Sequence, residues 1–158
     1  MWVTPHEKGM FRGVSNLNLD AKGRMAIPAR YRDRLLESCG GRLILTIDVD
    51  HCLLMYPLPE WERIEQALMS RPNMNPQVRR LQRLIVGHAT DVELDGQGRI
   101  LLPASLREYA ALEKHAVLVG QGNKFELWDE ESWASQRDAW LKEDIAGDPS
   151  AALESLSL

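Results

Sequence analysis

The stretch LDAKGRMAIPARYR, from Leu19 to Arg32, returns 75 residues later as LDGQGRILLPASLR, from Leu94 to Arg107. Seven of the fourteen positions are identical, whereas background composition would give about one match. Each copy keeps an aspartate, a glycine three positions later and an arginine directly after that glycine. The repeat predicts a chain built from two similar halves, each with the same Asp-x-x-Gly-Arg turn.

The glycine of each copy favours a tight reversal with positive φ over a helix. The aspartate before it would then accept hydrogen bonds from N–H groups of the turn and steady the following arginine. An arginine held in this way, with its guanidinium facing outward, matches the two acceptors on the major-groove edge of guanine. We therefore predict turn-supporting roles for Asp20, Gly23, Asp95 and Gly98.

The predicted DNA-binding residues are Arg24 and Arg99, with Lys22 and Gln97 beside them in the two turns. Lys22 adds a charge that suits a phosphate, whereas its counterpart Gln97 is neutral. A simpler interpretation is a surface Asp–Arg pair that only holds the hairpin, and such pairs contribute less than about 1 kcal/mol. Because both copies keep the pair and the glycine while the residues between them change, a functional role is favoured.

The expected elements follow the same order in both copies. In the first copy we expect strands at 13–19 and 24–27, a helix opened by Pro28, strands at 42–47 and 52–57, and a helix opened by Pro59. In the second copy we expect strands at 89–94 and 99–102, a helix opened by Pro103, strands at 116–120 and 124–128, and a helix from 129. Each half alone would expose open strand edges, so the halves are expected to pair into one closed barrel.

This order divides the chain into five parts. They are a flexible N-terminal extension at 1–9, a first repeat at 10–74, a connector helix at 75–88, a second repeat at 89–146 and a flexible acidic tail at 147–158. In the connector, Asn75 suits the N-cap and Pro76 the first helical position.

Charge is distributed unevenly along the chain. The formal net charge is −4, but 12–34 carries a net charge of +4 and 126–158 a net charge of −7. A basic face can act locally because screening at moderate salt has a range of about 10 Å. The acidic total therefore does not exclude nucleic acid as a partner.

Other classes of protein are disfavoured by the sequence. The first residues lack a secretory h-region and no apolar run reaches the length of a membrane helix, so we expect a cytoplasmic protein with no membrane partner. Cys39 and Cys52 fit no metal or redox spacing, and two free, partly buried thiols are expected. GQGNKF from Gly120 lacks the third glycine of a dinucleotide site and precedes a strand. We expect no cofactor, no metal and no enzymatic activity.

The turn segments and four further stretches of the sequence resemble the MraZ family of bacterial regulators. They are MFRG at Met10, both LD…GR…PA…R segments, CLLMYPLPEWERIEQ, RRLQRLIVGHA and KFELWDE. The resemblance runs from Met10 to the C-terminus. It implies an α+β fold with a swapped-hairpin β-barrel of the AbrB/SpoVT type, made from two internal repeats with flanking helices.

The resemblance also implies a sequence-specific DNA-binding transcriptional regulator. Its partner would be double-stranded DNA with repeated short motifs, in the promoter of the division and cell-wall gene cluster, within the bacterial cytoplasm and nucleoid. A homo-oligomer, expected to be a closed ring, would add several weak contacts along such DNA. Large apolar helix residues, including Trp61 and Trp133, suggest helices that pack between subunits.

A second function remains open at this point. The same type of barrel also serves in protein-interaction or antitoxin-like modules. Such a module would use a C-terminal segment that folds on its partner, and the acidic tail here is short for that purpose. Binding to the chain's own upstream DNA distinguishes the two.

Overall fold

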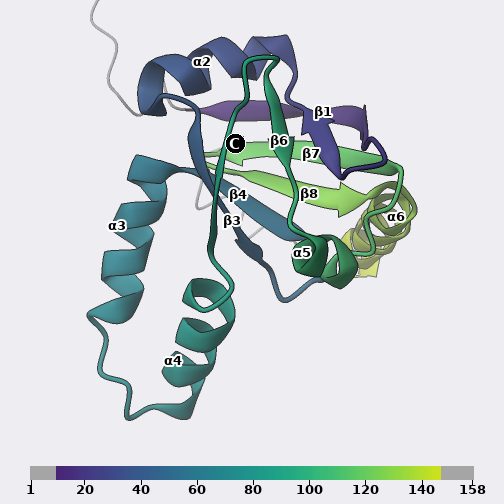
Figure 1. Ribbon diagram of the computed structural model, residues 1–158. Coiled ribbons are helices and arrows are strands. Elements are labelled where there is room, and N and C mark those ends of the chain that lie inside the picture. The colour runs from purple at the N-terminus through teal and green to yellow at the C-terminus, as the bar shows by residue number, and fades with distance from the viewer. Residues whose placement is uncertain (1–9, 147–158) are drawn as a thin grey trace, which may run out of the picture.

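The computed structural model describes residues 10–146 (Figure 1). The extension expected at 1–9 and the tail expected at 147–158 lie outside the described residues. The first half contains β1 (Phe11–Asn18), β2 (Arg24–Ala26), α2 (Ala29–Cys39), β3 (Arg42–Ile47), β4 (Leu53–Pro57) and α3 (Leu58–Met69). Next come α4 (Pro76–Leu81), the π-helical segment η1 (Gln82–Val86), β5 (Thr90–Glu93), β6 (Arg99–Leu101), α5 (Ala104–Tyr109), β7 (His115–Gly122), β8 (Phe125–Asp129) and α6 (Glu130–Ala146).

The strands of the two halves are interleaved in space. One antiparallel sheet has the strand order β1-β7-β8-β4-β3-β5, and β2 and β6 form a separate two-stranded sheet, called the ribbon below. Of the six pairings, β1–β7, β8–β4, β3–β5 and β2–β6 join strands from different halves. The fold is therefore α+β with antiparallel sheets, and each half alone would keep only one pairing, β3–β4 in the first half and β7–β8 in the second.

The core lies between the ribbon and the inner face of the large sheet. Alternation along β2 and the residue after it buries Met25 and Ile27, and Ile100 and Leu102 are their counterparts in the second half. The prolines at the starts of α2 and α5 act as N-cap residues, and Gly40 ends α2 at φ 63°. These prolines and this glycine thus mark where the helices around the core begin and end.

Helices from two parts of the chain cover the outer face of the large sheet. The first is α3 with η1, which packs over β3 and β4. The second is α6, whose Trp133 packs against Trp128 of β8 and its neighbours. Trp61 is only 2% exposed because Tyr56 and Ile44 of the same chain cover it. The expectation that Trp61 offers surface for another subunit is therefore wrong.

The connector is not one continuous α-helix. Asn75 caps α4 by accepting a hydrogen bond from the Gln77 N–H at 2.8 Å, as predicted, but the helix changes to π geometry at Gln82. The buried hydroxyl of Thr46 in β3 donates to the Ile85 carbonyl, which lies inside this π segment. Thr46 of β3 thus binds a carbonyl of the widened helical turn. The sequence periodicity of the connector does not reveal this contact.

None of the helices between residues 10 and 146 has both the length and the apolar character needed to cross a membrane.

Candidate nucleic-acid interface

The first turn is built around the Asp20 carboxylate. Its Oδ1 accepts hydrogen bonds from the backbone N–H groups of Lys22 at 3.0 Å and Arg24 at 2.8 Å. Its Oδ2 accepts from Nε of the Arg24 side chain at 2.7 Å. Gly23 sits at φ 85° and donates its N–H to the Asp20 carbonyl at 3.0 Å. The predicted reversal and its capping aspartate are both confirmed.

The second turn repeats this geometry. Asp95 Oδ1 accepts from the N–H groups of Gln97 and Arg99, both at 2.9 Å, and Oδ2 accepts from Arg99 Nε at 3.0 Å. Gly98 has φ 75°. Two sequences that share only their aspartate, glycine and arginine across the turn therefore reach the same structure, which shows that these three residues determine it.

Both aspartates are held in the charged form. The backbone N–H of Arg24 is the main cause that lowers the pKa of Asp20, assisted by the Arg24 guanidinium and the Lys22 N–H. The backbone N–H of Arg99 has the same role in lowering the pKa of Asp95. Each carboxylate therefore stays ionised at neutral pH and binds Nε of its arginine, so that the ion pair does not use the terminal NH₂ groups of the guanidinium.

Arg24 and Arg99 do not stand at the tips of the turns. Arg24 and Arg99 are the first residues of β2 and β6, and their side chains are 31% and 29% exposed. The exposed tip residues are Lys22 and Gln97. The arginines lie lower because each turn closes onto its own strand, through Asp20 N–H to the Arg24 carbonyl in the first copy.

The ribbon brings the two turns together on one surface. Arg24 pairs with Leu101, Met25 with Ile100 and Ala26 with Arg99. Because directly opposite residues point to the same face, Met25 and Ile100 face the core while the other four face outward. The turns flank the ribbon at its opposite ends, and the outer face therefore joins both predicted arginines into one continuous surface.

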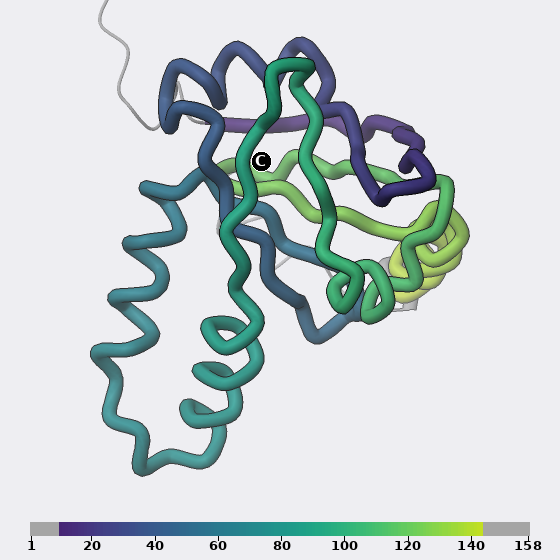
Figure 2. Tube along the Cα trace, viewed as in Figure 1, coloured from purple at the N-terminus to yellow at the C-terminus, as the bar shows by residue number. Residues whose placement is uncertain are grey.

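Each turn is also held by an arginine from the other copy, a contact that the sequence analysis missed. A Cβ added at Gly23 would lie 2.7 Å from Nε and Cζ of Arg107, and one added at Gly98 would lie closer still to Arg32. Figure 2 shows the second turn beside the helix of the first half that carries Arg32. The repeat itself contains a signal for this contact, because Arg32 and Arg107 occupy the last of its seven identical positions.

Hydrogen bonds reinforce the contacts by which each copy holds the turn of the other. The Ile27 N–H donates to the Gly98 carbonyl at 3.0 Å, and the Leu102 N–H donates to the Gly23 carbonyl at 2.9 Å. Arg107 Nε donates to the Leu102 carbonyl at 3.1 Å. Each copy thus positions the other copy's turn, with an approximate two-fold relationship about the middle of the ribbon.

Part of the basic segment at 12–34 lies elsewhere. Arg30 donates to the Tyr31 hydroxyl at 3.0 Å and also contacts Ser15 in β1. Arg34 donates to the Met10 carbonyl and lies over the Phe11 ring, 4.4 Å from its centroid. These arginines fasten β1 to α2, so the positive charge next to the ribbon is smaller than the sequence total suggests.

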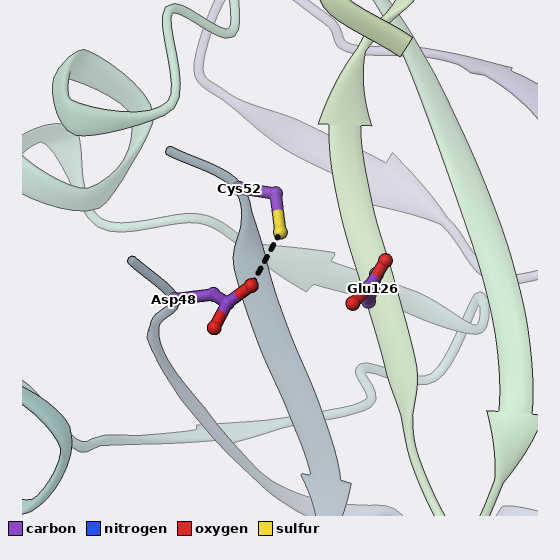
Figure 3. Close-up of side chains that lie close together, drawn as sticks. All are labelled: Asp48, Cys52 and Glu126. Carbon is purple, nitrogen blue, oxygen red and sulfur yellow. Dashed lines mark hydrogen bonds between the residues drawn. The ribbon is translucent and has the colours of Figure 1, made fainter. Parts of the chain in front are cut away.

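A separate cluster of possible metal ligands lies at the β3–β4 connection and on β8 (Figure 3). Asp48, Cys52 and Glu126 offer ligand atoms within 4.8 Å of one another. The Cys52 thiol donates to Asp48 at 3.6 Å, and the Trp128 indole donates to Glu126 at 2.9 Å. Burial, together with the charges of Glu126 and Asp48, strongly raises the pKa of Cys52, so the thiol stays protonated. Both Cys52 and the half-buried Cys39 are free thiols, as predicted.

Comparison with known proteins places the chain among relatives of one kind. The family model described as "MraZ protein, putative antitoxin-like" matches twice, at 10–84 and 85–154. A protein of Thioalkalivibrio sulfidiphilus called transcriptional regulator MraZ is 74% identical over 94% of this chain and 100% of its own length. Proteins with the same name from Halorhodospira halophila and Pseudomonas aeruginosa are 57% and 59% identical, over 94% and 84% of this chain and 100% and 88% of their own lengths.

Proposed function

The chain belongs to the MraZ family of transcriptional regulators, which is not a family of enzymes, and from this premise we propose that it binds double-stranded DNA with sequence specificity. The proposed contact surface is the outer face of the ribbon together with its two turns. Arg24 and Arg99 would read bases, and Lys22 would bind a phosphate. Asp20, Gly23, Asp95 and Gly98 would support the turns that carry them.

The observation that carries the proposal is the duplicated arginine geometry on one two-stranded ribbon. A two-stranded ribbon fits the major groove, which is about 12 Å wide. Two strands lie about 4.8 Å apart, which leaves room for side chains on either side of the ribbon. Each fork has its Nε fixed by an aspartate, so little side-chain freedom is lost when the terminal NH₂ groups meet O6 and N7 of guanine.

The approximate two-fold symmetry of the ribbon also supports DNA as the ligand. The backbones of the two DNA strands are related by two-fold axes, and proteins with two-fold symmetry bind sites whose halves mirror one another. Here a single chain supplies both halves. We infer that one subunit covers one short motif, with one turn over each end of it.

Assembly follows from the number of contacts. Two arginines are few for a site that competes with a whole genome, and repeated motifs bound by several linked subunits would multiply a weak affinity through effective concentration. We therefore propose a closed homo-oligomeric ring on promoter repeats of the division and cell-wall genes, in the bacterial cytoplasm and nucleoid. Exposed apolar residues on the α3–α4 arm, Met69, Met74 and Leu81, support a contact between subunits there.

We also propose that the two sheets close into a barrel of the swapped-hairpin type. The large sheet has β1 and β5 at its edges, and Leu19 at the end of β1 forms a bridge with Met25 of the ribbon. On the other side, the Asp95 N–H donates to the Arg99 carbonyl at 2.8 Å. These links at both edges support a closed barrel with the ribbon as its seam.

A gel-shift assay with the DNA upstream of the chain's own gene tests the proposal. Specific retardation that survives excess unrelated DNA and disappears for Arg24→Ala is expected. Retention of a cellular protein partner, with no shift of any DNA, would instead favour an antitoxin-like module. Circular dichroism of Arg24→Ala provides the folding control, since the Arg24 side chain is partly exposed and its ion pair is with Asp20 of the surface turn.

A further inference from the structure

The outer face of the ribbon carries one large exposed apolar side chain beside its arginines. Leu101 is 56% exposed and lies directly opposite Arg24. The two residues that support the ribbon from below, Met25 and Ile100, are almost completely buried, so the core is already filled without Leu101. Its side chain therefore serves neither the core nor the turn.

The equivalent position in the other half carries a different residue. The two-fold relationship that exchanges Arg24 and Arg99 also exchanges Ala26 and Leu101, because Ala26 lies opposite Arg99. Alanine there offers one methyl group, and leucine adds three carbons. The ribbon is thus symmetric in its arginines and asymmetric in the residue beside each of them.

The turns accentuate this asymmetry. Hydrogen bonding of the Leu102 N–H to the Gly23 carbonyl places the first turn at the end of the ribbon that carries Leu101. One end therefore presents Lys22, Arg24 and Leu101, and the other end presents Gln97, Arg99 and Ala26. The half with the first turn carries two cations and a large apolar side chain, whereas the other half carries one cation, the neutral Gln97 and the small Ala26.

We propose that Leu101 is a specificity-determining residue that contacts the 5-methyl group of a thymine next to the base read by Arg24. This inference rests on the proposed function. The thymine methyl is the apolar group that the major groove presents. Opposite residues of a ribbon have Cβ atoms about 5 Å apart, and successive bases are about 3.4 Å apart along a strand. A side chain beside Arg24 therefore falls on the same or the neighbouring base pair.

A consequence is that the two halves of each DNA motif differ in sequence. The half under Arg24 and Leu101 contains a thymine at a defined position. The half under Arg99 and Ala26 should have a weaker requirement, because alanine offers a single methyl group where leucine offers three further carbons. A single chain thereby binds its motif in one orientation, which gives a row of subunits a common direction along repeated sites.

The test replaces each thymine of a bound upstream fragment, one at a time, with deoxyuridine, which lacks only the 5-methyl group. For the unaltered chain, one position per motif should weaken binding by about fourfold, the value of one buried methyl-sized group. Leu101→Ala should bind the normal fragment about as weakly as the unaltered chain binds the deoxyuridine fragment, and should be insensitive to that replacement. Leu101→Met should keep most of the sensitivity.

Ala26→Leu is the matched gain-of-function variant. It should create a second thymine-sensitive position in the opposite half of the motif. Unchanged methyl sensitivity in Leu101→Ala would overturn the inference, and so would a change in subunit number by light scattering, which would make Leu101 a subunit contact. If the unaltered chain binds the fragment but no deoxyuridine weakens it, this inference fails while DNA binding stands. If the unaltered chain shifts no DNA, the proposed function itself fails.

Discussion

The guanidinium of Arg107, from the second copy, lies against Gly23 of the first, and Arg32 of the first copy lies in the same way against Gly98 of the second. Each glycine is thus constrained twice, by its positive φ and by the arginine that covers it. The two turns are therefore elements of one interlocked unit. A change at either glycine should affect the partner copy as well as its own.

Gly23→Ala should lower the free energy of unfolding by about 1–3 kcal/mol, because alanine at φ 85° is strained and its methyl group meets Arg107. Urea denaturation measures this. Gly96→Ala is the matched control, since Gly96 lies in the other turn, has no positive φ and has open space around its Cβ position. Equal stability of the two variants would contradict the role given to Arg107.

Replacing a ribbon arginine should weaken binding without unfolding the chain. Arg24→Ala should reduce affinity for the specific fragment by roughly 5- to 150-fold, the range for one base contact of 1–3 kcal/mol. Arg99→Ala should have a similar or smaller effect, because the neighbouring Gln97 is neutral. Fluorescence anisotropy at fixed salt measures both. Arg63→Ala is a suitable control, since Arg63 pairs with Glu60 on α3, away from the ribbon.

The sequence predicted the turns well because their geometry is local. Asp20, Gly23 and Arg24 determine a reversal within five residues, and the repeat supplied an independent second example. The arginines that cover the glycines could not be placed, because Arg107 and Gly23 are 84 positions apart and meet only after the strands of both halves interleave. The repeat showed that this arginine mattered, yet not which glycine it would contact.

The burial of Trp61 and the π geometry within the connector helix, neither of which the sequence predicted, both involve contacts distant in the sequence. A tryptophan on an amphipathic helix is compatible with a subunit contact or with its own core, and only the position of Tyr56 on β4 decides for the core. Likewise, the hydroxyl of Thr46 in β3 binds a carbonyl of the π segment that lies 39 residues further along the chain. Both are long-range contacts that no local pattern encodes.

Acid should weaken the turns in a defined pH range. The pKa values of Asp20 and Asp95 are lowered in the folded chain, so their contribution to stability is complete above the ordinary value of 3.8 and is lost as pH falls through the lower, folded-state values. The double variant Asp20→Asn/Asp95→Asn should therefore show a shallower decrease in melting temperature between about pH 4 and pH 2. Parallel curves for the variant and the unaltered chain over that range would contradict this account.

The two thiols should differ in reactivity because their burial differs. Cys52 is completely buried and its pKa is strongly raised, whereas Cys39 is partly exposed. With Ellman's reagent at pH 8, Cys39→Ser should leave a chain that reacts only as fast as it unfolds, and Cys52→Ser should leave a chain that reacts much faster. Both should react at equal rates in denaturant. Rapid native reaction of Cys52 would mean that the cluster with Asp48 and Glu126 opens to solvent.

Binding should depend steeply on salt and on the number of DNA motifs. Each phosphate bound by a cation such as Lys22 releases counterions, so the logarithm of affinity should fall linearly with the logarithm of salt concentration. Lys22→Ala should reduce that slope by about one per subunit bound, while Gln97→Ala, at the neutral tip, should leave it unchanged.

Titration of fragments with one, two and three motifs should show affinity rising with motif number. A monomer by light scattering that binds one motif as tightly as three would contradict the ring, because linked subunits gain their advantage only when several motifs are engaged together.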